Sequence, residues 1–394
     1  MVSPPKAAAA SSFFHGENLL RLIATALVQL SRQRGPQDPV YGHAVQSAYN
    51  HLVLLCLRCG EPPPDSVPGM VRWAAERTLR DWPLALPTDL EAADGYLVDT
   101  VTRMPTQQCF EWAISAPDPA AEEFENQLLR EALTTTRAAK EPQAYTAFRK
   151  LLITRPVLTG TELALLGADL YLALLHDTIK RSYEPAPASY LHDDQFAECE
   201  RCHCLLVPVG LGTQRGWRCE LDRCQRERHA RIGRRLSPAL AGGVYQLTRP
   251  LRMFITGPGL AETELETALV ALNLKPEMWP NFDAYDLRIT LPDQQVWAID
   301  VKDRANPALL GRNAQPLRPD PPYDRALLVV PQYRFDEREA YQRIFNHHGP
   351  DEIIGRLELL SDSQLLRRVK TELRRIRHRS SEPAAPSQEG PSHA

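Results

Sequence analysis

Apolar residues recur three and four positions apart through most of the first half of the chain, from about residue 13 to residue 183. The segments NLLRLIATALVQLSRQ and NQLLREALTTTRAAK have this spacing, which is typical of helices with one face against a core. Clusters of proline and glycine, such as Pro62-Pro63-Pro64, interrupt the pattern and mark connections between helices. We therefore predict an all-α N-terminal interaction domain over residues 1–188.

One stretch of this domain, AYTAFRKLLITRPVLTGTELALL, contains two short amphipathic segments joined at Arg155-Pro156. Thr159 or Thr161 is placed to cap the second segment. The pattern fits a helix-turn-helix that reads DNA, and it also fits a plain helical hairpin, which is the commoner arrangement in helical domains.

From about Gly243 the pattern changes to alternating helix and strand. The segment GLAETELETALVALNL has leucines at helical spacing, whereas DLRITL and VWAIDVK alternate apolar and polar residues as half-buried strands do. A further apolar run, RALLVV, predicts another strand. We predict an α/β domain over residues 241–379, followed by a disordered tail over residues 380–394 that lacks large apolar side chains.

The composition is that of a globular multidomain protein. The chain has 394 residues, of which 43% are hydrophobic and 24% charged, and its formal net charge of −3 indicates no particular partner. Its N-terminal sequence MVSPPKAAAASS has no secretory pattern, and no apolar run approaches the roughly 20 residues that span a bilayer. We expect a cytoplasmic protein without a membrane segment.

Five of the eight cysteines fall between Cys199 and Cys224. A Cys-x-x-Cys pair is followed by a Cys-x₄-Cys pair, which is the spacing of a zinc ribbon with a structural, closed Zn²⁺ site. We predict this ribbon over residues 189–240. The predicted ligands are Cys199, Cys202, Cys219 and Cys224. His203 or Cys204 is close enough in sequence to replace Cys202 as a ligand.

Arginines surround and follow the ribbon and predict a local positive field. They are Arg215, Arg218, Arg223, Arg226, Arg228, Arg231, Arg234 and Arg235. Nucleic acid is one natural partner for such a field. A solvated charged face, or a dock for an acidic protein, fits the same sequence equally well.

Four charged residues of the α/β domain form a candidate catalytic set. Asp300 and Lys302 are two apart on one strand and project from the same face. Asp286 begins the preceding strand, so the register of the hairpin can bring it beside them. Glu262 lies one helical turn before the core position Leu265 and can look into the same site.

This set suits metal-dependent hydrolysis of a phosphodiester. Mg²⁺ binds one or two carboxylates plus waters and phosphate oxygens, and Asp286 and Asp300 would supply the carboxylates. Lys302 would position the attacking water or stabilise the pentavalent phosphate. Glu262 would hold a metal-bound water or a second metal ion.

Two of these assignments have rivals nearby in the sequence. Asp283 competes with Asp286 as the first aspartate. Glu264 or Glu266 could turn inward in place of Glu262.

The order E-x-x-L-x-x-x-L, then D, then D-x-K on an apolar strand resembles the PD-(D/E)xK superfamily of restriction enzymes and junction resolvases. The resemblance covers roughly residues 250–370 and implies an αβββαβ fold with Mg²⁺- or Mn²⁺-dependent nuclease activity. The family proline is not adjacent to Asp286, because Pro280 lies six residues earlier.

A narrower resemblance covers the whole layout. The stretches FRKLLITRPVLTGTELALL, CERCHCLLVP and WPNFDAYDLRI resemble the restriction-endonuclease-fold component of bacterial three-gene islands that pair a PIWI-type protein with a helicase and a nuclease. The resemblance implies those two partners and a role in defence against phage or plasmid DNA, with an RNA-guided or R-loop target.

Two questions about the whole protein stay open at this point. The alternative function is that of a zinc-containing nucleic-acid-binding or scaffold protein whose nuclease-like domain does not cleave. A homodimer is also compatible with the sequence, because cutting both strands at once needs two active sites.

Overall fold

The structure is a computed structural model. It describes residues 16–32, 41–87, 95–114, 119–210, 216–226 and 230–381, with the backbone alone for 119–126, 380 and 381. The predicted tail, apart from the end of the last helix, lies outside the described residues. Within the described part of the chain, no helix combines the length and the apolar character needed to cross a bilayer.

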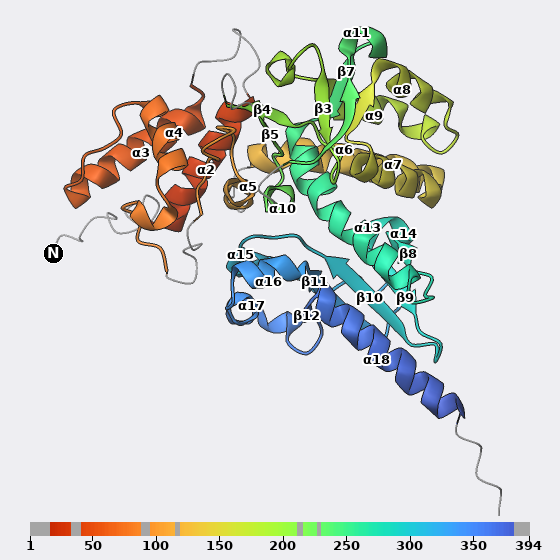
Figure 1. Ribbon diagram of the computed structural model, residues 1–394. Coiled ribbons are helices and arrows are strands. Elements are labelled where there is room, and N and C mark those ends of the chain that lie inside the picture. The colour runs from red at the N-terminus through yellow and green to blue at the C-terminus, as the bar shows by residue number, and fades with distance from the viewer. Residues whose placement is uncertain are drawn as a thin grey trace, which may run out of the picture.

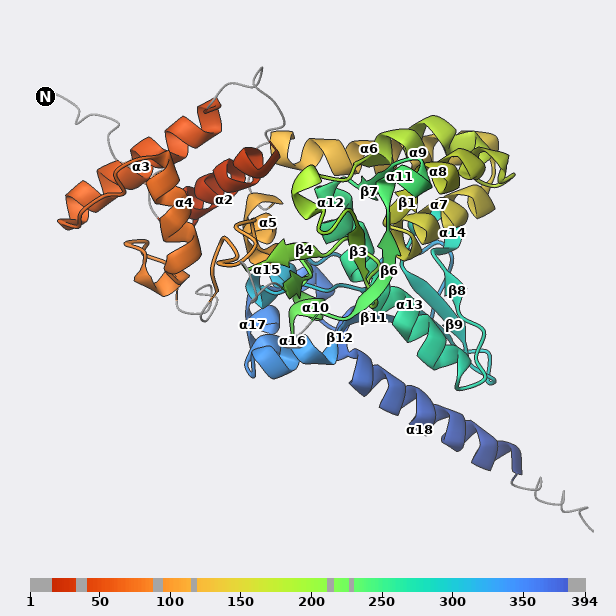
Figure 2. The same ribbon diagram turned by 45° about the horizontal axis from the view of Figure 1, so that its top comes forward.

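The N-terminal part is mainly helical, as the spacing of apolar residues predicts. Its helices are α2 (Glu17–Arg32), α3 (His43–Cys59), α4 (Val67–Glu76), α5 (Gln107–Ile114), α6 (Pro119–Ala139), α7 (Pro142–Thr154), α8 (Gly160–Leu165) and α9 (His176–Ser182). Short 3₁₀ turns lie at η2 (Leu79–Asp81), η3 (Leu166–Ala168), η4 (Ala173–Leu175) and η5 (Ala188–Tyr190). Helices α2 to α5 share one apolar core, and α6 and α7 belong to a second. Figure 2 shows α2, α3 and α4 on the left, apart from α7 on the right.

The prediction that this part is entirely α-helical is wrong at two short segments. The strands β1 (Val157–Thr159) and β2 (Tyr183–Pro185) each pair antiparallel with β7 (Val244–Leu247), giving the sheet order β1-β7-β2. Strands of three residues are too short to have a readable alternation, and they form because a distant segment supplies the partner. The pairing joins residues on both sides of the predicted boundaries.

The helix-turn-helix interpretation is also wrong, because the connection between α7 and α8 contains the strand β1, which pairs with β7, and is not a simple turn. The predicted cap at Thr159 is confirmed. Its hydroxyl accepts from the Glu162 amide at 3.0 Å, and the Glu162 carboxylate accepts from the Thr159 amide at 2.8 Å. These two bonds form a capping box at the start of α8.

The cysteine-rich segment forms two antiparallel strand pairs, β3 (Phe196–Cys199) with β6 (Ile232–Leu236) and β4 (Val207–Val209) with β5 (Gly216–Arg218). A four-residue helix, α10 (Asp222–Gln225), follows β5, and α11 (Pro238–Ala241) leads to β7. The buried cysteines belong to the same apolar cluster as helices α2 to α5. The ribbon therefore packs against the N-terminal helices.

The C-terminal part is a five-stranded sheet with order β12-β11-β10-β9-β8. Its strands are β8 (Glu277–Met278), β9 (Leu287–Thr290), β10 (Val296–Val301), β11 (Arg325–Val330) and β12 (Glu358–Ser361). Strands β8 to β10 are antiparallel, whereas β10, β11 and β12 are parallel. Helix α13 (Gly257–Val270) precedes β8, and α15 (Pro307–Arg312) connects β10 to β11. The elements thus follow the predicted order of helix, three strands, helix and strand.

Helices cover both faces of this sheet (Figure 1). Helices α13 and α18 (Asp362–Ser381) share an apolar core with one face, and α15 and α17 (Tyr341–His348) pack on the other. The remaining elements are α12 (Arg249–Leu251), the π-helix η7 (Arg252–Thr256), α14 (Pro280–Asp283), α16 (Gln332–Glu337) and η8 (Asp351–Ile353).

Candidate active site

The strand register brings three of the predicted catalytic residues together. Ile299 of β10 pairs with Leu287 of β9, so Asp300 and Asp286 form the next pair along the hairpin. Lys302 Nζ donates to Asp300 Oδ1 at 2.8 Å and lies 3.5 Å from Asp286 Oδ2. The Val301 amide also donates to Asp286 Oδ2, at 2.6 Å. Alternation along β10 and the hairpin turn are therefore enough to assemble this group.

Glu262 reaches the same group through an arginine of the N-terminal part. Its side chain is 2% exposed on α13, and Oε1 accepts from Arg149 Nη2 at 3.1 Å. Oε2 accepts from the indole nitrogen of Trp279 at 2.6 Å. Arg149 Nη2 is also 3.8 Å from Asp286 Oδ1. Both oxygens of Glu262 are thus held in place by residues that the sequence analysis did not identify.

The rivals of these residues fall in different places. Asp283 faces the same group, because Tyr145 donates to its Oδ2 at 2.8 Å and Arg149 Nη1 lies 3.8 Å away. Glu264 instead accepts from Arg223 at 2.6 Å on the exposed side of α13. Glu266 lies outside the cleft that Glu262, Asp286, Asp300 and Lys302 line.

The four candidate catalytic residues line a cleft of about 410 Å³ between α7, α13 and the β9–β10 hairpin. The charged residues of its wall are Arg149, Glu262, Asp283, Asp286, Asp300, Lys302, Asp303 and Arg304. In the sequence, Arg149 stands four residues after Tyr145 and so shares its helix face. Nothing in the sequence connects that face to residues more than a hundred positions away.

The loop that carries Trp279 and Asp283 has an unusual backbone. Trp279, Asn281, Phe282 and Asp283 all have positive φ angles, between 46° and 65°. Residues other than glycine rarely adopt positive φ angles. Where they do, the surrounding structure holds them there, often at functional sites. The contacts of Trp279 and Asp283 with Glu262, Arg149 and Tyr145 provide that enforcement.

The cluster holds more negative than positive charge. The wall of the cleft carries five carboxylates, of Glu262, Asp283, Asp286, Asp300 and Asp303, but only three cationic side chains among the described residues, those of Arg149, Lys302 and Arg304. Burial, followed by the charge of Glu262, raises the pKa of Asp286 well above its usual value. Burial alone would lower the pKa of Lys302, but Asp286 and Asp300 raise it above the usual value, so this lysine stays protonated. Uncompensated oxygen ligands of this kind fit a hard divalent cation such as Mg²⁺.

The cysteine group has the geometry of a metal site. The Sγ atoms of Cys199, Cys202, Cys219 and Cys224 are buried and lie within 4.8 Å of one another. Tetrahedral coordination with Zn–S bonds of 2.3 Å needs sulfur atoms about 3.8 Å apart. The four residues could therefore hold a tetrahedral metal ion. Cys204 is buried outside this group, and His203 is exposed.

Arginines of the ribbon are engaged inside the molecule. Arg218 pairs with Asp99, Arg223 with Glu264 and Arg226 with Glu337, all outside the ribbon. Arg234 pairs with Glu198 of the ribbon itself and with Glu162 outside it. Arg215 and Arg228 lie outside the described residues. The predicted positive field is thus reduced by internal ion pairs, a possibility that the sequence analysis did not consider.

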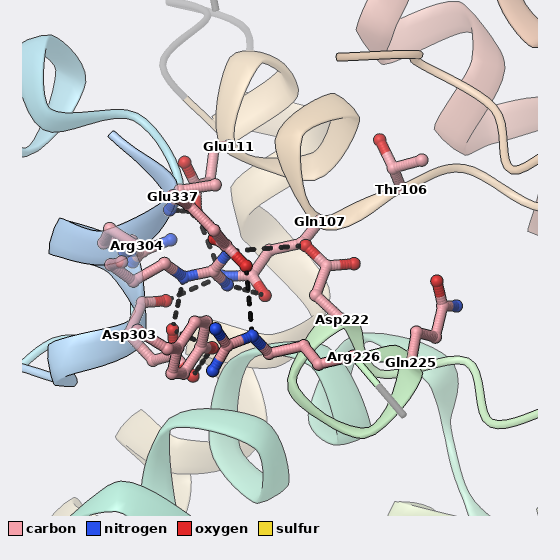
Figure 3. A network of polar contacts seen from close by, with 12 residues as sticks. Thr106, Gln107, Glu111, Asp222, Gln225, Arg226, Asp303, Arg304 and Glu337 are labelled. Atoms are coloured by element: carbon pink, nitrogen blue, oxygen red, sulfur yellow. Dashed lines mark hydrogen bonds and ion pairs between the residues drawn. The ribbon is translucent and has the colours of Figure 1, made fainter. Parts of the chain in front are cut away.

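Asp303, the residue after Lys302, belongs to a network of polar contacts that joins three regions of the chain (Figure 3). Asp303 accepts from Arg334 Nε at 2.7 Å, and its backbone carbonyl accepts from Gln107 Nε2 at 2.6 Å. Arg334 also donates to Gln107 Oε1 at 2.9 Å and lies 3.6 Å from Asp222. Helix α5, the ribbon helix α10 and the C-terminal sheet therefore meet beside the cleft.

Two segments of the chain match known protein families. Residues 19–159 match the family described as pPIWI_RE three-gene island domain Y, and residues 259–377 match the family described as REase associating with pPIWI_RE. The resemblance inferred from the sequence is thereby confirmed. No curated protein and no solved structure matches the chain. Arg149 lies in the first matched segment, whereas Glu262, Asp286, Asp300 and Lys302 lie in the second, so both contribute to the cleft.

Proposed function

We propose that this chain, which pairs pPIWI_RE domain Y with the associated REase, is a metal-dependent nuclease that cleaves DNA as the effector of a defence island. The observation that carries the proposal is the meeting of Asp286, Asp300 and Lys302 across β9 and β10 in a cleft with excess negative charge. A domain that only docks has no need for buried, mutually repelling carboxylates, which cost free energy unless a cation binds them.

Each residue has a role that follows from its contacts. Asp286 and Asp300 would bind Mg²⁺ or Mn²⁺ through their carboxylate oxygens. When bound, such an ion activates water and neutralises charge on the phosphate. The carboxylates of Asp286 and Asp300 raise the pKa of Lys302 and so favour its charged form, which would donate to a non-bridging oxygen of the scissile phosphate as negative charge develops there.

Glu262 keeps some capacity for a further contact. Each of its oxygens accepts one hydrogen bond in the structure, and a carboxylate oxygen has two acceptor positions. It would therefore accept from a water in the cleft while Arg149 and Trp279 fix its orientation.

The island context supplies the rest of the proposal. The matched families are named for a three-gene island with a PIWI-type component. We propose that this component and a helicase direct the nuclease to DNA, with an R-loop or an RNA-guided duplex as the target. The four-cysteine site would hold structural Zn²⁺ and stabilise the ribbon.

The test is cleavage of supercoiled plasmid by the full chain with Mg²⁺, Mn²⁺ or EDTA, alone and with the other island proteins. We expect metal-dependent nicking that falls on the order of 100-fold or more in Asp300→Ala and in Lys302→Ala. Asp293→Ala is the matched control, because this aspartate lies exposed in the turn between the same two strands. Cleavage that persists in Asp300→Ala would contradict the assignment of the site.

The defence role has its own measurement. Plasmid interference by the complete set of island genes should be lost when Asp300→Ala is introduced and retained with Asp293→Ala. Interference that survives Asp300→Ala would mean that this chain is not the effector.

A further inference from the structure

Arg304 differs from the other arginines around the cleft. It follows β10 closely, only two residues after Lys302, and its side chain is partly buried. Within the described part of the chain, its guanidinium has no hydrogen bond and no ion pair, and its Cζ lies 5.6 Å from the ring centroid of Phe254. Among the described residues its charge therefore has the ring face of Phe254 beside it but no carboxylate, at the edge of a site that would bind a polyanion.

The neighbouring arginines are all engaged with carboxylates. Arg149 pairs with Glu262, Arg252 with Glu220, and Arg334 with Asp303. A partly buried guanidinium loses some hydration, and a carboxylate normally compensates for that loss. The planar fork of N–H donors also matches the oxygens of a phosphate.

The position of Arg304 connects two hollows. It lines the 410 Å³ cleft of the carboxylates and also a neighbouring pocket of about 170 Å³, and both share Ile114 and Lys302. Asn306 and Asn313 also line the second pocket. The two hollows thus adjoin at Ile114, Lys302 and Arg304, where an extended strand would leave the site.

The polar groups of the second pocket suit an anionic chain. Glu111 lines it, but its carboxylate already accepts the amides of Ala305 at 2.8 Å and Asn306 at 2.9 Å. Asn306 is fully buried, and its Nδ2 has no hydrogen-bond partner, although its Oδ1 accepts two backbone amides. An unpaired buried donor is unfavourable, and an acceptor oxygen of a ligand would offset that cost.

We propose that Arg304 binds a phosphate of the nucleic-acid strand next to the one cleaved beside Asp300 and Lys302, and that the strand continues into the pocket of Asn306 and Asn313. The inference rests on the proposed nuclease function and assigns the path of its substrate. Arg304 is a positioning residue for that strand and takes no part in the chemical step.

The test is the affinity of the full chain for a fluorescent DNA duplex, measured by anisotropy over a series of salt concentrations. Ca²⁺ replaces Mg²⁺ so that binding is measured without cleavage. Arg304→Gln should raise the Kd about tenfold and lower the slope of log Kd against log salt by about 0.9, the value for one lost phosphate contact. Arg304→Lys should restore most of the slope, because it keeps the charge.

The matched control is Arg343→Gln, which removes an exposed arginine of α17 that lines neither hollow. It should leave both the Kd and the slope at the wild-type values. In the plasmid assay, Arg304→Gln should raise KM and keep kcat within about twofold.

Three outcomes are distinguishable. An Arg304→Gln protein that binds DNA with the wild-type Kd and salt slope would overturn this inference and leave the nuclease proposal standing. The same holds if its affinity falls with an unchanged salt slope, because the defect would then be structural. A wild-type protein that binds no DNA, alone or with the island proteins, would overturn the proposed function and this inference together.

Discussion

Arg149 and Glu262 are 113 residues apart in the chain, and their side chains meet in the buried wall of the cleft with Nη2 3.1 Å from Oε1. The two side chains are 9% and 2% exposed. Arg149 belongs to the segment that matches domain Y, and Glu262 belongs to the segment that matches the REase. The helical part therefore supplies a cation that the carboxylates of the other part need.

Removal of this cation should destabilise the protein. Arg149→Gln leaves Glu262 and Asp286 buried without their compensating charge, and breaking one side of a buried ion pair costs about 3 kcal/mol or more. The free energy of unfolding, measured by denaturant titration, should fall by that amount. The double variant Arg149→Gln/Glu262→Gln should recover part of the loss, because no uncompensated charge of the pair remains. A single variant as stable as the wild type would show that the pair is not a strong contact.

A second contact between the same parts should also matter. The Glu111 carboxylate accepts the amides of Ala305 and Asn306, which follow Lys302 closely. Glu111→Ala leaves the buried amide of Asn306 and the partly buried amide of Ala305 unpaired, and should lower the free energy of unfolding by about 3 kcal/mol. Glu337→Ala is the control, because the Glu337 side chain is 44% exposed and its ion pairs should contribute less than about 1 kcal/mol. Equal losses in the two variants would count against this prediction.

The cysteine site predicts a specific pattern of metal content. The purified wild-type chain should contain one Zn²⁺ ion, and Cys219→Ser should lose it and unfold at a lower temperature. Cys204→Ser should keep its zinc, because Cys204 lies outside the group of four. Elemental analysis and thermal unfolding measure both effects. Loss of zinc in Cys204→Ser, with zinc retained in Cys202→Ser, would instead support Cys204 as the ligand.

Asp222 predicts a dependence of stability on pH. Burial raises its pKa to about 6, and the charges of Asp303 and Glu111 act in the same direction against that of Arg334. A carboxyl group with a raised pKa in the folded state contributes stability below its unfolded pKa of about 4, and that contribution is lost as the pH rises through 6. Since the side chain is 30% exposed, water screens part of the effect.

Asp222→Asn cannot titrate, so its melting temperature should rise relative to the wild type between pH 4 and pH 7. Thermal unfolding at a series of pH values measures this difference. Asp293→Asn, at an exposed turn position, should follow the pH dependence of the wild type. A melting difference between Asp222→Asn and the wild type that stays constant with pH would rule out Asp222 as a source of the dependence.

The sequence by itself determined whatever depends on local spacing. Alternation along VWAIDVK put Asp300 and Lys302 on one face, and the short hairpin limited the registers that could bring Asp286 beside them. The two cysteine pairs are each on a tight turn, so their grouping needed little of the fold around them. The family resemblance followed from the same local motifs.

Only the tertiary structure decided which distant residues complete these groups. Strand β7 pairs with two short segments of the helical part and forms a sheet with them. Arg149 of α7 reaches Glu262 in the wall of the cleft. Arg218 and Arg223 of the ribbon pair with carboxylates elsewhere in the chain, whereas Arg304 has no carboxylate partner among the described residues. The physical reason is that a charged residue in the sequence shows only that a partner is needed if the residue is buried. Which residue becomes that partner depends on how distant segments pack together, and no local spacing in the sequence records it.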